Sequence, residues 1–177
     1  MRKRSPVAFV IFALLIVAAV IAVGSFETPR TMLALTLAGK PARLVMPVRG
    51  ARTEGLVDSF QDLPGASAHR ALDIFCVRGT DVLAPARGLV VSVGSNVVRL
   101  FGPGGQSHVL SNVVPRAGLA PGQSVEAGEV VGQVDDPSGA ERGSTPHLHY
   151  ALTGITGRAI DPYPLLASAA TPGPSSR

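Results

Sequence analysis

The stretch "LAPGQSVEAGEVVGQV" (119–134) has the pattern of short strands joined by tight turns. Glycine occurs at positions 122, 128 and 132, between short runs of valine and polar residues. Glycine adopts the backbone angles of tight turns at little cost, and it lets two strands approach each other closely. We therefore predict that Gly122, Gly128 and Gly132 lie at turns or at tight strand crossings.

Short runs rich in valine, leucine and isoleucine precede and follow this stretch, with turn signals such as "GPGG" and "APGQ" between them. No convincing helical period occurs among them. The sequence therefore predicts an all-β domain of antiparallel strands, a sandwich or a barrel. The runs are "RLVMPV" (43–48), "ALDIFCV" (71–77), "GLVVSVG" (88–94), "NVVRLFG" (96–102), "SHVLSNVV" (107–114), "EVVGQV" (129–134) and "HLHYALT" (147–153).

A chain of 177 residues suits a single folded domain. We place this domain at residues 44–166 and read residues 25–43 as a linker. Residues 167–177 are small, polar and rich in proline, which predicts a disordered tail.

The N-terminal segment, residues 1–24, begins with basic residues and continues with an uncharged apolar run over 7–23. We expect an apolar helix there, near the lower length limit for crossing a bilayer. The basic head would stay in the cytoplasm. We therefore expect an anchor in the inner membrane, with the domain in the periplasm or another extracytoplasmic space. Cleavage as a signal peptide before export is the alternative.

The formal charge of +4 does not indicate a nucleic-acid partner. Arg2, Lys3 and Arg4 supply three of the 16 basic residues, so 13 basic residues face 12 acidic ones in the remainder. No cluster of lysine and arginine with interleaved aromatic residues occurs, and we predict no binding to nucleic acid. The single cysteine, Cys76, excludes an intramolecular disulfide.

Three of the four histidines fall into two motifs that could bind a metal ion. His147 and His149 share one face of a strand because side chains alternate along it. His69 and Asp73 share a face for the same reason. Histidine and aspartate are suitable zinc ligands, and three protein ligands leave a fourth position open for water. The alternatives are a packing or surface pair of histidines, and an aspartate paired with an arginine.

The order His-x-x-x-Asp, Gly-x-x-Val-x-x-Gly and His-Leu-His resembles the lysostaphin-type zinc metallopeptidases. These are peptidoglycan endopeptidases with a β-sandwich related to the duplicated hybrid motif. The resemblance covers residues 44–166 and implies one zinc ion held by His69, Asp73 and His149. It also implies that His147 is catalytic, as one of the family's two catalytic histidines.

The sequence departs from the family pattern at the second catalytic histidine. Counting back from "AGLAPGQSV" (117–125), that position falls on Ser111. His108 lies three residues earlier, and in a regular strand an odd separation places it on the opposite face. We therefore expect Ser111 to face the metal site and His108 to point elsewhere. The alternative is that a bulge brings His108 into the site.

Two functions follow from this combination of a complete ligand set and an incomplete catalytic pair. The first is a zinc endopeptidase that cuts peptide cross-links of bacterial peptidoglycan, with activity reduced or lost through Ser111. The second is a catalytically degenerate module that binds peptidoglycan or activates a cell-wall amidase. Degenerate members of the family usually lose zinc ligands as well, and the three ligands kept here favour the enzyme.

Overall fold

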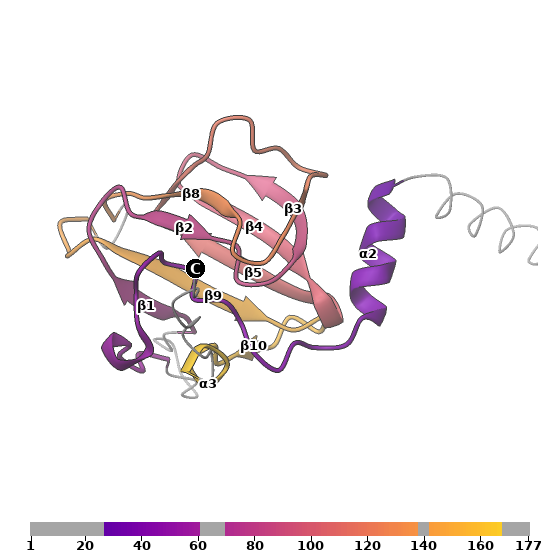
Figure 1. The fold of residues 1–177 in the computed structure, drawn as a ribbon, viewed down its shortest axis with the longest axis horizontal. Helices are drawn as coiled ribbons and strands as arrows, with labels where there is room; N and C mark the ends of the chain where they lie inside the picture. Colours follow the sequence, from indigo (N-terminus) through magenta and orange to yellow (C-terminus); the bar gives the residue numbers. More distant parts are fainter. Residues whose placement is uncertain (1–26, 61–69, 138–141, 168–177) are drawn as a thin grey trace, which may run out of the picture.

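The computed structural model describes residues 27–60, 70–137 and 142–167, and within these ranges ten strands form two antiparallel sheets (Figure 1). The large sheet has the order β1-β9-β5-β4-β3-β7, with β10 paired to β9, and the small sheet has the order β2-β8-β6. The strands are β1 Leu72–Phe75, β2 Asp81–Leu83, β3 Gly88–Val93, β4 Val97–Gly102, β5 Gln106–Ser111, β6 Val113–Pro115, β7 Ser124–Val125, β8 Val130–Val134, β9 His147–Thr153 and β10 Ala159–Ile160.

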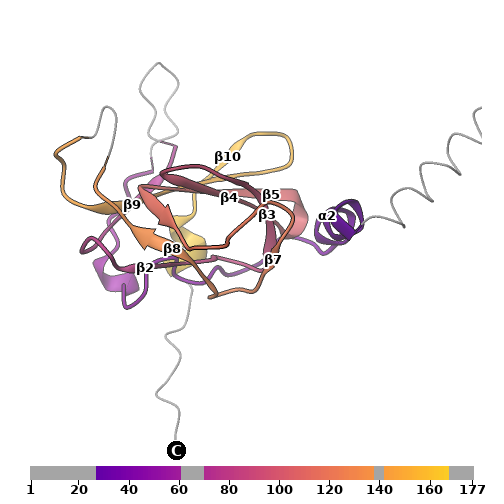
Figure 2. The same cartoon turned by 90° about the horizontal axis from the view of Figure 1, so that it is seen from above.

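The two sheets pack face to face, and the hydrophobic core lies between them (Figure 2). On β9, the alternate residues Leu148, Tyr150 and Leu152 are completely buried in this core. Val131 and Val134 of β8 belong to the same buried cluster. Burial of such side chains stabilises the fold by about 1.5–3 kcal/mol each. The prediction of antiparallel β-structure is confirmed, and the two-layer arrangement does not close into a barrel.

The glycines of residues 119–134 lie where the sequence predicted turns or close strand contacts. Gly122 and Gly128 have φ angles of 89° and 83°, which residues with a side chain rarely adopt. A Cβ atom at Gly132 would lie 2.5 Å from both a Val113 methyl carbon and the Val114 carbonyl oxygen. Glycine therefore allows the close pairing of β8 with β6, and this prediction is confirmed.

A single residue joins β5 of the large sheet to β6 of the small sheet. Strand β5 ends at Ser111 and β6 begins at Val113, so Asn112 alone joins them. Its φ angle of 61° turns the chain sharply at this point. Among the described residues it is the one non-glycine residue with a positive φ angle.

Helix α2 (Glu27–Leu37) lies within the segment that the sequence suggested as a linker. It sits beside β3 at one end of the sandwich (Figure 1). Only Leu35 of this helix is buried, so the sequence shows no apolar stripe that would predict a helix. The other helices within the described residues are short: α3 (Tyr163–Ala167) and the 3₁₀ turns Thr53–Gly55 and Pro103–Gly105.

The expected placement in the inner membrane needs correction. In the described ranges, the structure contains no helix with the length and apolar character needed to span a bilayer. The apolar run 7–23, on which that expectation depended, lies outside the described residues. We therefore withdraw the membrane-anchored localisation.

The core contains a buried polar pair that involves His108. The Nδ1 atom of His108 lies 2.7 Å from the Tyr150 hydroxyl oxygen, and the two side chains are 1% and 0% exposed. Burial lowers the pKa of His108 from 6.5 to about 4, because the interior disfavours the charged imidazolium. The histidine is therefore neutral in the folded protein at neutral pH.

Acid should destabilise the fold through this histidine. The unfolded chain takes up a proton at His108 near pH 6.5, whereas the folded protein does so only near pH 4. The free energy of unfolding should therefore fall as pH drops between these values, by about 3 kcal/mol at 1.36 kcal/mol for each pH unit. Urea unfolding at pH 7 and pH 4 measures this loss. The double variant His108→Leu/Tyr150→Phe removes both polar partners and should lose about 3 kcal/mol less; an equal loss would contradict the assignment.

Candidate metal centre

The candidate site lies on the face of the large sheet that points away from the core. Because side chains alternate along β9, Leu148 and Tyr150 point into the core while His147 and His149 point outward. The two histidines are therefore neighbours on the outer face, as their spacing in the sequence predicted.

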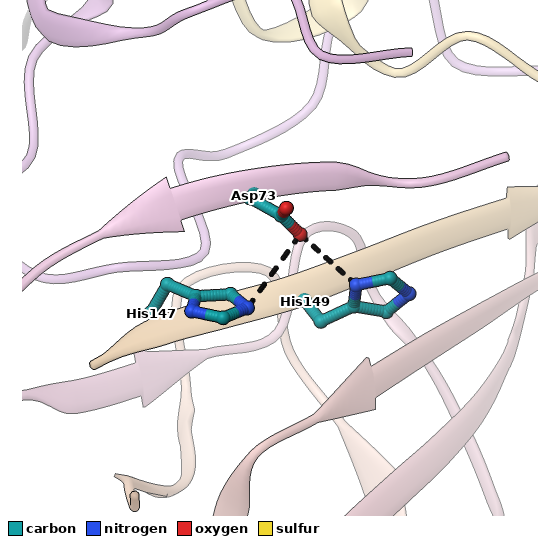
Figure 3. A group of neighbouring side chains, drawn as sticks. All are labelled: Asp73, His147 and His149. Atoms are coloured by element: carbon teal, nitrogen blue, oxygen red, sulfur yellow. Dashed lines mark hydrogen bonds and ion pairs between the residues drawn. The ribbon is translucent and has the colours of Figure 1, made fainter. Parts of the chain in front are cut away.

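Strand β1 brings Asp73 to the same place. It pairs antiparallel with β9, and Asp73 lies directly opposite His149. The Asp73 Oδ1 atom is 2.9 Å from Nδ1 of His149 and 3.8 Å from Nε2 of His147 (Figure 3). One ligand atom from each of the three side chains lies within 4.8 Å of the others. The structure thus brings two of the predicted ligands, Asp73 and His149, into direct contact.

The site is open on one side and supported on the other. The side chains of Asp73 and His149 are 20% and 26% exposed, whereas that of His147 is 5% exposed. The aromatic ring of Phe75, also on β1, lies 5.4 Å from the His147 ring and is itself exposed. A molecule from solvent can therefore reach Asp73 and His149 directly, beside an apolar side chain.

Hydrogen bonds with neighbouring residues hold two parts of the site in place, the backbone of Asp73 and the ring of His147. The backbone N–H of Asp73 donates to the Ser59 hydroxyl oxygen at 3.0 Å. The Nδ1 atom of His147 lies 2.8 Å from the Thr145 carbonyl oxygen. A carbonyl oxygen can only accept, so Nδ1 carries the hydrogen and Nε2 of a neutral ring has the lone pair. Sequence reasoning did not find Ser59 or Thr145, because neither belongs to a spaced motif.

The geometry fits a metal ion bound between β1 and β9. Zinc binds histidine nitrogen and carboxylate oxygen at 2.0–2.2 Å, which places two tetrahedral ligands roughly 3.3 Å apart. The Asp73 and His149 donors already face each other at 2.9 Å. A hydrogen bond that joins the two strands without any metal is the alternative interpretation of this contact. His69, the third predicted ligand, lies outside the described residues.

Strand β5 places Ser111 beside the candidate site. Ser111 lies opposite His149 in the β5–β9 pairing, so the two share the outer face. His108 lies opposite Leu152, and its side chain is buried in the core against Tyr150. The alternative in which a bulge brings His108 into the site is therefore wrong.

Comparison with known proteins shows the family of this chain. The model of Peptidase family M23 matches residues 67–162, which is 96 of the 177 residues. The chain belongs to Peptidase family M23. The match includes all four residues that sequence reasoning assigned to the site, His69, Asp73, His147 and His149.

Solved structures share the fold of this M23 domain. Lysostaphin, from Staphylococcus simulans, is 25% identical with a TM-score of 0.52; the match covers 66% of this chain and 55% of lysostaphin. Csd3 of Helicobacter pylori is 21% identical with a TM-score of 0.55, covering 72% of this chain and 35% of Csd3. A chain of the SpoIIQ–SpoIIIAH pore-forming complex is 21% identical with a TM-score of 0.58, covering 73% and 98%. This chain therefore corresponds to about a third of Csd3. A search of curated proteins found no match.

Proposed function

We propose that this M23 domain is a zinc-dependent endopeptidase that cuts peptide cross-links of bacterial peptidoglycan. The observation that carries the proposal is the convergence of Asp73 and His149, whose donor atoms lie 2.9 Å apart on an open face of the sheet. M23 peptidases are zinc-dependent, and peptidoglycan hydrolases occur among them. Lysostaphin, which this chain resembles, is an antimicrobial peptidase.

In this proposal His69, Asp73 and His149 hold one zinc ion. When bound, the ion supplies Lewis-acid polarisation of the scissile carbonyl and lowers the pKa of its water. Asp73 contributes negative charge to the ligand set, and its contact with Ser59 fixes the backbone that presents the carboxylate. Asp73 comes from β1 and His149 from β9, so the pairing of these two strands determines their separation.

His147 is the proposed catalytic residue. Its Nε2 atom lies on the metal side, 3.8 Å from the Asp73 carboxylate. Its hydrogen is held at Nδ1 by the Thr145 carbonyl oxygen. Nε2 can therefore accept a hydrogen bond from water or from the substrate amide next to the metal ligands. The exposed ring of Phe75 provides an apolar contact for a peptide side chain beside it.

Ser111 supports a second candidate function, a catalytically degenerate module that binds peptidoglycan or activates a cell-wall amidase. The family's second catalytic histidine would stand at this position, opposite His149. A serine hydroxyl donates a hydrogen bond but does not exchange protons near neutral pH as imidazole does. General acid–base assistance typically contributes 10²–10⁴-fold, so its partial loss lowers or abolishes cleavage.

Digestion of purified cell-wall sacculi by the full chain distinguishes the two functions. We expect slow loss of peptide cross-links from the sacculi with zinc present, no loss after chelation, and recovery when zinc is added back. Sedimentation with intact sacculi measures binding independently of cleavage. Binding without cleavage, together with stimulation of an added amidase, would contradict the endopeptidase and support the degenerate module. If the chain neither binds nor cleaves sacculi, both functions are contradicted.

A further inference from the structure

Asn112 combines an unusual backbone conformation with a buried side chain beside the candidate site. Its φ angle is 61°, and its side chain belongs to a residue that is only 4% exposed. Asparagine adopts this left-handed conformation more readily than most residues, and glycine adopts it more readily still. The turn between the sheets therefore accepts either asparagine or glycine at position 112. The contacts of the side chain give asparagine a role that glycine does not have.

Those contacts orient the Asn112 amide. Its Oδ1 atom accepts from the Asn96 amide nitrogen at 3.5 Å, and its Nδ2 atom lies 3.4 Å from Nε2 of His147. An amide has donors on one side and an acceptor on the other, so both contacts require the same orientation. In that orientation the Asn112 amide donates toward His147.

The other ring nitrogen of His147 agrees with this direction. Nδ1 faces the Thr145 carbonyl oxygen at 2.8 Å and carries the hydrogen. Nε2 is then an acceptor in the neutral ring, which matches an amide donor from Asn112. Two contacts from different segments thus favour one tautomer and one ring orientation. Nε2 is also the nitrogen nearer to Asp73 Oδ1, at 3.8 Å.

We propose that Asn112 is a positioning residue: its amide donates to Nε2 of His147 at 3.4 Å, holds the ring in the Nδ1–H tautomer, and gives up this long contact when water or substrate binds at Nε2. It follows directly after Ser111, where the family's second catalytic histidine is missing. Asn112 acts through His147 and has no role in the reaction by itself. The proposal rests on the proposed function insofar as His147 takes part in cleavage, whereas the tautomer is a property of the folded chain.

Two variants that tolerate the left-handed turn test the role. Asn112→Asp keeps the shape and replaces the amide donor by an acceptor, so it should place a hydrogen on Nε2 of His147. Asn112→Gly keeps the turn and removes the donor, so only the Thr145 contact still favours the Nδ1–H form, and a share of the Nε2–H form should appear. Long-range ¹H–¹⁵N correlation spectra of the full chain at about pH 8 report which ring nitrogen is protonated. A His147→Gln variant identifies the signals, and thermal unfolding checks that each variant folds.

In the unmodified chain, we expect a protonated Nδ1 and an unprotonated Nε2, with and without zinc. A protonated Nε2 there, or unchanged nitrogen shifts in Asn112→Asp, would overturn the proposal. On sacculi, both variants should lower kcat at least tenfold with KM nearly unchanged; equal kcat would also overturn it. If no form cleaves sacculi, the proposed enzymatic function fails, and the spectra still decide the role of Asn112.

Discussion

Replacing Asp73 by asparagine should abolish tight zinc binding by the full chain. The asparagine side chain has nearly the same size but lacks the negative charge that the proposed ligand set depends on. Loss of groups that only support a ligand typically weakens metal affinity 10–100-fold, so loss of a ligand itself should weaken it by more than about 100-fold. Isothermal titration with zinc measures the change, and metal content after dialysis provides a second readout.

Asp81→Asn is a matched control for this substitution. Asp81 lies on β2 in the other sheet, where its carboxylate pairs with Arg49 at 2.9 Å. This variant should bind zinc as the unmodified chain does. If Asp73→Asn retains the zinc affinity of the unmodified chain while folding normally, Asp73 is not a ligand. The contact with His149 would then be a hydrogen bond between two strands.

Replacing Ser111 by histidine should increase the cleavage of peptidoglycan peptides by up to about 10²–10⁴-fold, if the domain holds zinc as proposed. Ser111 lies directly opposite His149, and Cβ atoms of such cross-strand pairs are about 4.5–5.5 Å apart. An imidazole at this position can therefore reach the space beside the metal ligands and supply the second catalytic histidine. Initial rates on one peptidoglycan substrate with zinc present measure the gain.

Ser107→His controls for the addition of a histidine to the same strand. Ser107 shares the outer face of β5 with Ser111 but lies opposite Thr153, two cross-strand pairs beyond Val109 and Ala151. Histidine there should leave the rate unchanged. A gain in both variants would indicate a general effect of added imidazole. No gain in Ser111→His, with zinc affinity intact, would contradict the idea that a missing histidine limits the activity.

Much of the fold was predictable because strand and turn signals are local. Six of the seven predicted runs contain strands, and Gly122 and Gly128 marked turns that need positive φ angles. The run "RLVMPV" (43–48) forms only an isolated bridge from Val48 to Val82, and β2 and β10 were not among the predicted runs. Helix α2 was missed because its sequence buries a single residue, Leu35, and so has no clear apolar stripe. The assignment of strands to two sheets was also beyond the sequence, since the chain changes sheet at several connections, and local strand signals do not show which strands pair.

The candidate site was predictable to the extent that it depends on alternation within strands. The spacing of His147 and His149 placed both on one face, and an odd separation placed His108 away from Ser111. The contact between Asp73 and His149 required the register of β1 against β9, which only long-range packing determines. No sequence motif pointed to Asn112, because its contact with His147 arises only when the chain turns between the two sheets.

The division of β9 into a core face and a site face has a consequence for evolutionary drift. Every second side chain maintains the sandwich, while the residues between them face outward, and two of these are the candidate-site residues His147 and His149. Substitutions at outward positions usually change stability by less than about 0.5 kcal/mol. A lineage can therefore exchange the side chain at position 111 and keep a well-folded domain, which remains available for selection as a binding module.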